Sequence, residues 1–278
     1  MKTKQFHSIH PAVEREVRTE RLMKTCHLIA ALSIVFALVF PLSANALGME
    51  AAAGGWLQAP SGTLGYKALS SNDILDLDSN LNYEEELRPL GRLKIDMPVF
   101  IPNIYVMYTP MEFEGNGVKS GMFKFGNQTF NGSAGFSSQL TLDNADFALY
   151  YGIPGLETAT LNTLNVDVGI NLRLYDVEAQ IAQEPNVHET ASFLAPIPML
   201  YLASQFRPID ELALEVEGRG ISIGDDSAYS LIGRLRWNAI GPLFLSGGYR
   251  YDKVDIEEDD LTVDTDFSGP FIEVGVAF

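Results

Sequence analysis

The residues of this chain that could do chemistry are basic side chains at every second position of short apolar segments. Arg234 and Arg236 lie in SLIGRLRWN, Arg219 lies in LALEVEGRG, and Arg250 lies in LFLSGGYRYD. Because successive side chains of a β-strand point to opposite faces, these guanidinium groups share a face with other polar residues. Such a stripe could guide an anionic solute. The same groups could instead pair with carboxylates and fill a closed interior.

The same parity places further charges of both signs on that face. The basic members are Arg92, Lys94, Arg173, Arg219, Arg234, Arg236 and Arg250, and the acidic members are Asp167, Glu215, Glu217 and Glu273, together with Glu50, Asp96, Asp146 and Asp252. The two signs are nearly balanced, and an unpaired charge in a narrow interior is costly. We therefore predict a salt-bridge network that fills much of the interior. A selective path for anionic or other small solutes is the alternative.

Catalytic chemistry would need a nucleophile or an activated water beside a general base, which is usually histidine. The only histidine after residue 46 is His188, in NVHETAS, a segment that we predict to be a polar loop. Paired with Asp225 or Asp226, it would resemble part of the site of an omptin-like surface protease, but no omptin motif surrounds it. We predict that the protein has no catalytic residues and is not an enzyme, with a surface hydrolase as the alternative.

Two acidic segments, DILDLDSNLNYEEE (73–86) and DIEEDDLTVDTD (255–266), are predicted to be solvated loops. Clustered carboxylates can hold Ca²⁺ or Mg²⁺, and here they could hold the cations that bridge lipopolysaccharide phosphates. The candidate ligands are Asp259, Asp260, Asp264 and Asp266. Their spacing matches no defined calcium loop. We therefore predict no cofactor and no resident metal, with loosely bound divalent cations as the alternative.

The first 46 residues are interpreted as export signals rather than as part of the fold. Residues 23–46 combine a basic start, an apolar run and an A-x-A exit at Ala44 and Ala46, which is typical of a cleaved signal peptide. Residues 1–22 are interpreted as an extended or misannotated N-terminus. An uncleaved anchor helix is the alternative, but the apolar run is short for a membrane span.

The predicted exported chain, 47–278, is strongly acidic and has no cysteine. The chain as a whole carries a formal charge of −17, and the first 46 residues hold six Lys/Arg and three Asp/Glu, which leaves 13 basic and 33 acidic residues and a net charge of −20. Nucleic-acid binding is excluded at that charge. Disulfides and thiol chemistry are excluded as well, because Cys26 is the only cysteine.

The elements that must position the charges are strands with a period of two. We expect them near 47–58, 87–98, 103–113, 138–151, 161–175, 196–207, 211–223, 227–238, 242–254 and 268–278. Short connections with Pro or Gly alternate with long polar ones, which is typical of outer-membrane barrels. The prediction is an all-β, antiparallel, up-and-down transmembrane barrel of ten strands, with eight or twelve as alternatives. The segment GMFKFGNQTF is expected to extend into solvent as a hairpin.

The last strand, GPFIEVGVAF, alternates and ends in phenylalanine, with Ile272, Val274, Val276 and Phe278 on one face. In this the chain resembles outer-membrane β-barrel proteins of Gram-negative bacteria. GGWLQAPSGTLGY, PMLYL, GRGISI, GYRYD and DFSGPFIEVGVAF are similar to a small group of such barrels without an assigned reaction. The resemblance implies an outer-membrane location, contact with lipid and lipopolysaccharide, and a terminal strand read by the barrel-assembly machinery.

Aromatic residues near the expected strand ends are interpreted as interfacial girdles. They are Trp56, Tyr105, Tyr108, Tyr151, Tyr201, Trp237, Tyr249 and Tyr251.

The remaining expectation concerns function. We predict a structural or surface-interaction barrel with a narrow, charged lumen and acidic extracellular loops, and a small selective channel is the alternative.

Overall fold

The computed structural model describes residues 48–278 except 99, 225 and 259, so the predicted signal peptide and the residues before it lie outside the described part. No helix within this part is long and apolar enough to cross a membrane.

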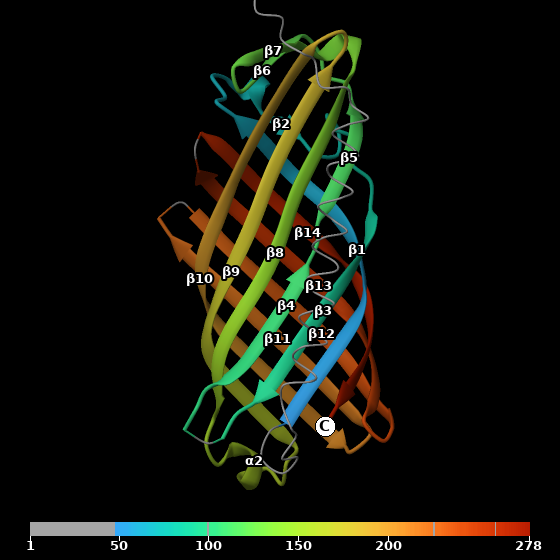
Figure 1. Cartoon of the computed structure of the whole chain (residues 1–278), viewed down its shortest axis with the longest axis vertical. Helices are drawn as coiled ribbons and strands as arrows, with labels where there is room; N and C mark the ends of the chain where they lie inside the picture. Colours follow the sequence, from blue (N-terminus) through green and yellow to red (C-terminus); the bar gives the residue numbers. More distant parts are fainter. Residues whose placement is uncertain (1–47, 99, 225, 259) are drawn as a thin grey trace, which may run out of the picture. The chain divides into compact units, whose positions relative to one another are not determined.

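Ten antiparallel strand positions close into a barrel (Figure 1). In order around the ring they are β1 (Gly48–Tyr66), β3 (Glu86–Asp96), β4 (Asn103–Thr109) continued by β5 (Glu112–Gly117), β8 (Phe136–Gly152), β9 (Leu164–Gln183), β10 (Val187–Ile209), β11 (Leu212–Ile223), β12 (Asp226–Ile240), β13 (Leu243–Glu258) and β14 (Leu261–Ala277). Pairing of β1 with β14, from Glu50↔Ala277 to Tyr66↔Leu261, closes the ring and leaves no free edge there. The predicted fold class and strand number are confirmed.

The two ends of the barrel differ. At the terminal end, where β1 begins and β14 finishes, the connections are 97–102, 153–163 with the short helix α2 (Leu156–Ala159), 210–211 and 241–242. The loop end has two long connections, 67–85 and 118–135, and three short ones, 184–186, 224–225 and 259–260.

Several strands run further toward the loop end than predicted. The expected polar loop around His188 is part of β10, where His188 pairs with Ala182 of β9. The expected acidic loop at 255–266 is the top of the β13–β14 hairpin, with Asp255 opposite Asp264. Both loop predictions were wrong because the alternation of apolar and polar residues continues through these segments. Near the loop end the apolar residues point into the barrel, whereas near the terminal end they point outward.

The two long connections fold back into the barrel mouth. The first carries η1 (Ser71–Asp73) and β2 (Leu75–Asp76), and β2 pairs with the end of β1. The second carries β6 (Met122–Phe125), β7 (Gln128–Asn131) and η2 (Gly132–Ala134). The expected β6–β7 hairpin forms, but it does not project into solvent. The Gly126 amide donates to the Tyr66 carbonyl at 2.8 Å and the Asn131 amide to Gln183 Oε1 at 3.0 Å, so the hairpin reaches from β1 to β9.

The outer surface of the barrel carries an apolar band toward the terminal end. Its exposed members include Phe147, Leu149, Val168, Ile170, Leu172, Leu200, Leu202, Leu214, Leu231, Leu235, Leu245, Ile272 and Val274. Toward the loop end, the same outward face carries polar residues such as Asp176, Glu178, Thr190 and Ser192. A closed barrel with an even strand number and an apolar outer band is the architecture of bacterial outer-membrane proteins, which confirms the predicted transmembrane barrel and its location.

The predicted aromatic girdle is correct for only part of its members. Exposed rings on the outside are Tyr108, Tyr151, Trp237 and Tyr249, and Tyr251 is half-buried there. The prediction was wrong for Trp56, Tyr105 and Tyr201, which are buried in the lumen. Trp56 has the inward parity of Glu50 on β1, and Tyr105 and Tyr201 have the inward parity of the buried Met107 and Met199 on their own strands.

Candidate functional site

The lumen near the terminal end is filled by thirteen charged side chains, which we call the ionic core. They are Glu50, Arg92, Lys94, Asp146, Arg173, Glu215, Glu217, Arg219, Arg234, Arg236, Arg250, Asp252 and Glu273. Seven are basic and six are acidic. They meet because each occupies an inward-pointing position of its strand, so that all thirteen side chains enter the lumen.

One group of the ionic core centres on Glu217 of β11. Its carboxylate pairs with Arg219 at 3.0 Å, with Arg234, and with Lys94 at 3.2 Å. Lys94 belongs to β3, which stands five positions from β11 in the ring of ten, so this ion pair joins opposite walls of the barrel. The side chains therefore meet at the centre of the lumen.

Arg234 of this group lies 3.8 Å from Glu273 of β14, and three further ion pairs surround Glu273 and Glu50 on the closing strands. Arg92 of β3 pairs with Glu50 and lies 3.1 Å from Glu273. Arg236 of β12 pairs with the other carboxylate oxygen of Glu50. The Ser246 hydroxyl donates to Glu273 at 2.9 Å. Because strands β1, β3, β12 and β14 all contribute, the network crosses the β1–β14 closure.

A second group of the ionic core lies nearer the loop end. Arg173 of β9 donates from Nε and Nη2 to the two oxygens of Asp146, at 2.8 Å each, and is 3.4 Å from Asp252 across the lumen. Arg250 and Asp252, two residues apart on β13, pair at 2.6 Å. Arg250 also donates to Thr109 at 2.8 Å. The fork-to-fork geometry of Arg173 with Asp146 is the strong form of this interaction.

Aromatic rings cover the guanidinium faces that no carboxylate reaches. Arg250 lies over Trp56 with its central carbon 4.4 Å from the ring centroid, and Arg219 lies 4.8 Å from Tyr105. The Trp56 indole donates to the Gly269 carbonyl at 3.1 Å. These rings were missed as lumen residues, although the parity of Trp56 with Glu50 on the same strand was a usable signal. Stacking on rings stabilises buried cations without further anions.

Two predicted site residues lie at the edge of the network. Asp167 accepts from Asn165 Nδ2 at 3.0 Å near the terminal end of β9. Asp96, at the end of β3, is exposed. Within the buried network, Nε and Nη1 of Arg219 and Nη2 of Arg92 have no hydrogen-bond partner. The sequence-predicted charges are thus brought together with the exception of Asp167 and Asp96.

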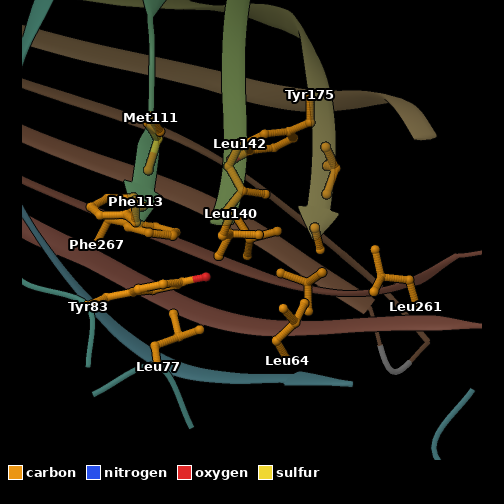
Figure 2. Close-up of a cluster of buried hydrophobic side chains, with 14 of the residues drawn as sticks. Leu64, Leu77, Tyr83, Met111, Phe113, Leu140, Leu142, Tyr175, Leu261 and Phe267 are labelled. Carbon is orange, nitrogen blue, oxygen red and sulfur yellow. The ribbon is translucent and has the colours of Figure 1, made fainter. Parts of the chain in front are cut away.

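Toward the loop end the lumen changes character and becomes apolar. We call this region the apolar plug, and its members include Leu64, Leu75, Leu77, Leu81, Tyr83, Met111, Phe113, Phe123, Phe125, Phe130, Phe136, Leu140, Leu142, Tyr175, Val177, Ile181, Leu261, Val263 and Phe267. Figure 2 shows side chains from several strands and from the first long connection converging there. Phe113 stacks on Phe267 with centroids 5.4 Å apart. The plug was missed from the sequence because its loop segments were expected in solvent.

Asp73, in the first long connection, anchors this connection to the β6–β7 hairpin. Its Oδ1 accepts from the Lys124 amide at 2.7 Å, and its Oδ2 accepts from the Ser70 amide at 2.9 Å and the Leu69 amide at 3.1 Å. Burial acts to raise the pKa of Asp73, but these hydrogen bonds outweigh it and hold the pKa below the usual value.

The candidate hydrolase and cation ligands that the structure describes do not form a site with one another. His188 is exposed on the outer face of β10, and no hydrogen bond or ion pair among the described residues joins it to Asp226. Asp225 and Asp259 lie outside the described residues. Asp264 and Asp266 face Lys253, at 2.8 and 3.7 Å. No group of three potential metal ligands occurs in the described part of the chain.

Comparison with known proteins yields likeness only at the level of structure. No protein-family model and no curated protein matches the sequence. Among solved structures, the outer membrane protease OmpT from Escherichia coli aligns with a TM-score of 0.48 and 9% identity over 83% of this chain and 97% of that one. The translocator domain of autotransporter NalP from Neisseria meningitidis aligns with a TM-score of 0.42 and 10% identity over 95% and 98%. Ail of Yersinia pestis aligns with a TM-score of 0.36 and 9% identity over 84% of this chain and 99% of that one. No activity follows from these similarities.

Proposed function

We propose that the protein is a closed, non-conducting outer-membrane barrel with a structural or surface-interaction role. The observation that carries the proposal is the contact of Lys94 with Glu217 at 3.2 Å, which joins opposite walls of the ring. An ion that crossed the lumen would have to separate paired charges and then pass the apolar plug. Both steps oppose conduction, because the first leaves buried charges unpaired and the second offers no polar ligands.

Conductance of the purified protein in planar bilayers tests this proposal. We expect insertion without steady current steps, with an open porin in the same bilayer as the control for sensitivity. Liposome swelling with small sugars and amino acids is expected to remain at the level of empty vesicles. Reproducible single-channel steps from the unmodified protein would overturn the closed-lumen proposal.

One observation favours a small anion path as the second candidate function. The ionic core has one more basic than acidic member, and Arg219 keeps two buried N–H groups without a partner. Positively charged rings select anions. If current steps do occur, the reversal potential in a KCl gradient distinguishes the candidates, and an anion-selective value would support this path.

The surface role rests on acidic residues at the loop end, which we place outside the cell because long connections of such barrels are extracellular. Asp176, Glu178 and Glu257 are exposed there, with Lys253 among the few cations nearby. We propose contact with lipopolysaccharide through shared divalent cations. Retention of lipopolysaccharide during purification should then be higher in Mg²⁺ than in EDTA, and an Asp176→Asn, Glu178→Gln variant should lose part of that difference. Equal retention would contradict this contact.

Assembly is proposed to depend on the last strand. Ile272 and Val274 are each 59% exposed on the outer face of β14, and Phe278, which directly follows the strand, is 70% exposed. We propose that the barrel-assembly machinery reads this face before the β1–β14 pairing covers the strand edge. Deletion of Phe278 is expected to lower the amount of heat-modifiable, folded protein in membranes, whereas Phe278→Tyr should not.

A further inference from the structure

The wall of the barrel parts between β10 and β11. Their ladder ends at the pair Leu200↔Gly220. Beyond this pair, β11 runs on to Ile223 and β10 reaches Val187, so both strands continue without pairing to each other. We call this gap the seam. Because a strand edge normally pairs or is covered, an unpaired stretch inside a closed wall requires a cause.

Two prolines supply that cause. Pro196 and Pro198 lie in β10 and keep their register with β9, opposite Leu174 and Leu172. Since the β9–β10 ladder runs unbroken through both prolines, their ring nitrogens face the opposite side, toward β11. Continuing the register would place Pro198 opposite Ser222, where an N–H would donate to extend the β10–β11 ladder and proline has none, whereas Pro196 lies just past the end of β11. The sequence of β10 therefore holds the seam open.

A cavity of about 300 Å³ occupies the seam. Its lining is mainly aliphatic and includes Leu194, Ile197, Pro198, Ile221, Ile223 and Ile256. Ile197 and Ile256 point inward and pack against the apolar plug. Leu194 is 64% exposed on the outer face of β10, and Ile223, which has the inward parity of Glu217 and Arg219, is 67% exposed at the tip of β11. The cavity thus runs from the outer surface, beside the apolar band, to the edge of the plug.

The rim of the cavity is acidic. Asp226 and Glu257 line it, and the Glu257 amide donates to Asp226 Oδ1 at 3.2 Å. No basic side chain belongs to the lining. Two carboxylates at the mouth repel an anionic head group and attract a cationic one. The volume is at the lower end for ligand sites, which suits one hydrocarbon chain rather than a two-chain lipid.

We propose that the seam is a binding site for the hydrocarbon chain of a single-chain amphiphile with an uncharged or cationic head group. The chain enters from the outer band between the prolines of β10 and the tip of β11, and its end contacts Ile197 and Ile256. The head group stays at the rim beside Asp226 and Glu257. This site lies in the wall, so it does not depend on whether the lumen conducts.

Photo-crosslinking tests the site. The full chain is expressed, purified from membranes and placed in lipid nanodiscs with diazirine-bearing hexadecanol, hexadecylamine or hexadecanoic acid. Mass spectrometry then locates the adducts. We expect adducts concentrated on 194–198, 221–223 and 226–228, with the amine and the alcohol exceeding the acid by about fivefold, which corresponds to roughly 1 kcal/mol. Adducts spread evenly around the outer band would overturn the proposal.

Variants separate the parts of the inference. Ala195→Trp fills the cavity and should remove the seam adducts, whereas Ala145→Trp, on the outer face of β8, should leave them. Pro196→Val with Pro198→Val restores two N–H donors and should reduce the adducts by letting the ladder extend. Asp226→Asn with Glu257→Gln should keep the alcohol adducts and abolish the preference over the acid. Seam adducts that persist in both the tryptophan and the valine variants would refute the site.

Discussion

The two halves of the lumen are built from the same strands and are chemically opposite. Inward residues of β9 near the terminal end include Asn171 and Arg173, whereas further along the same face they are Val177, Ala179 and Ile181. The outer face changes in the reverse sense, from exposed Ile170 and Leu172 to polar residues. The wall is thus apolar on its outer face near the terminal end and apolar on its inner face near the loop end.

The difference follows from what surrounds each half. Where hydrocarbon surrounds the barrel, moving apolar side chains into the lumen gains little free energy. Polar side chains must instead find their hydrogen-bond and ion-pair partners inside the lumen. Where water lies outside, the hydrophobic effect drives apolar side chains inward, as in a soluble protein. The position at which the two faces exchange character therefore marks the membrane boundary on each strand.

The largest expected effect comes from leaving a charge unpaired in the ionic core. Arg173→Met removes the guanidinium that meets both oxygens of Asp146, whose carboxylate is fully buried. We expect the free energy of unfolding to fall by about 3–5 kcal/mol. Urea titration of folding into vesicles, followed by gel mobility, measures it. The paired variant Arg173→Met, Asp146→Leu should recover most of the loss, and a similar loss in both variants would contradict the assignment.

A substitution in the apolar plug should cost about as much through a different mechanism. Phe113 is fully buried and stacks on Phe267, so Phe113→Ala removes contacts and leaves a cavity. We expect a loss of about 3 kcal/mol. Unlike the Arg173 variant, it should show no rescue by a second charge change. The same urea titration, repeated at high salt, should give an unchanged loss, because no ion pair is involved.

The strands and the inward charges were predictable because period two fixes which residues share a face. The plug was not predicted, although one signal for it was present. Apolar residues occupy even positions up to Leu174 and odd positions from Tyr175, so the pattern in β9 changes phase once. Interpreting only the first phase ends the strand too early and turns its remainder into a loop. The loop contributions of Leu77 and Phe123 depend on long-range folding that no local pattern encodes.

The outer face offers a smaller and more local test of the same boundary. Leu202 and Ser192 both point outward from β10, one in the apolar band and the other beyond it. Leu202→Arg should lower the free energy of unfolding by about 2 kcal/mol, since lipid must then solvate a cation. Ser192→Arg should change it by less than about 0.5 kcal/mol. Equal effects in the vesicle titration would place the boundary elsewhere.

The smallest expected effect concerns how the plug is held by the loops. Asp73→Asn replaces an oxygen that accepts the Ser70 and Leu69 amides, and we expect the protection of the Lys124 amide to fall by about 1 kcal/mol in hydrogen exchange. Because the folded pKa of Asp73 is lowered, its contribution is complete above the unfolded pKa of about 4 and is lost as pH falls through the folded value.

Exchange of the Lys124 amide, normalised to its intrinsic rate, should therefore lose protection on acidification below about pH 4 in the natural protein but not in the Asp73→Asn variant. Asp78→Asn, an exposed change in the same connection, is the matched control and should behave like the natural protein. If both variants lost the acid response, the attachment of the hairpin would depend on the whole first connection and not on Asp73. If neither variant lost it, apolar contacts alone would hold the loops in the plug, and the Asp73 carboxylate would not be needed for their attachment.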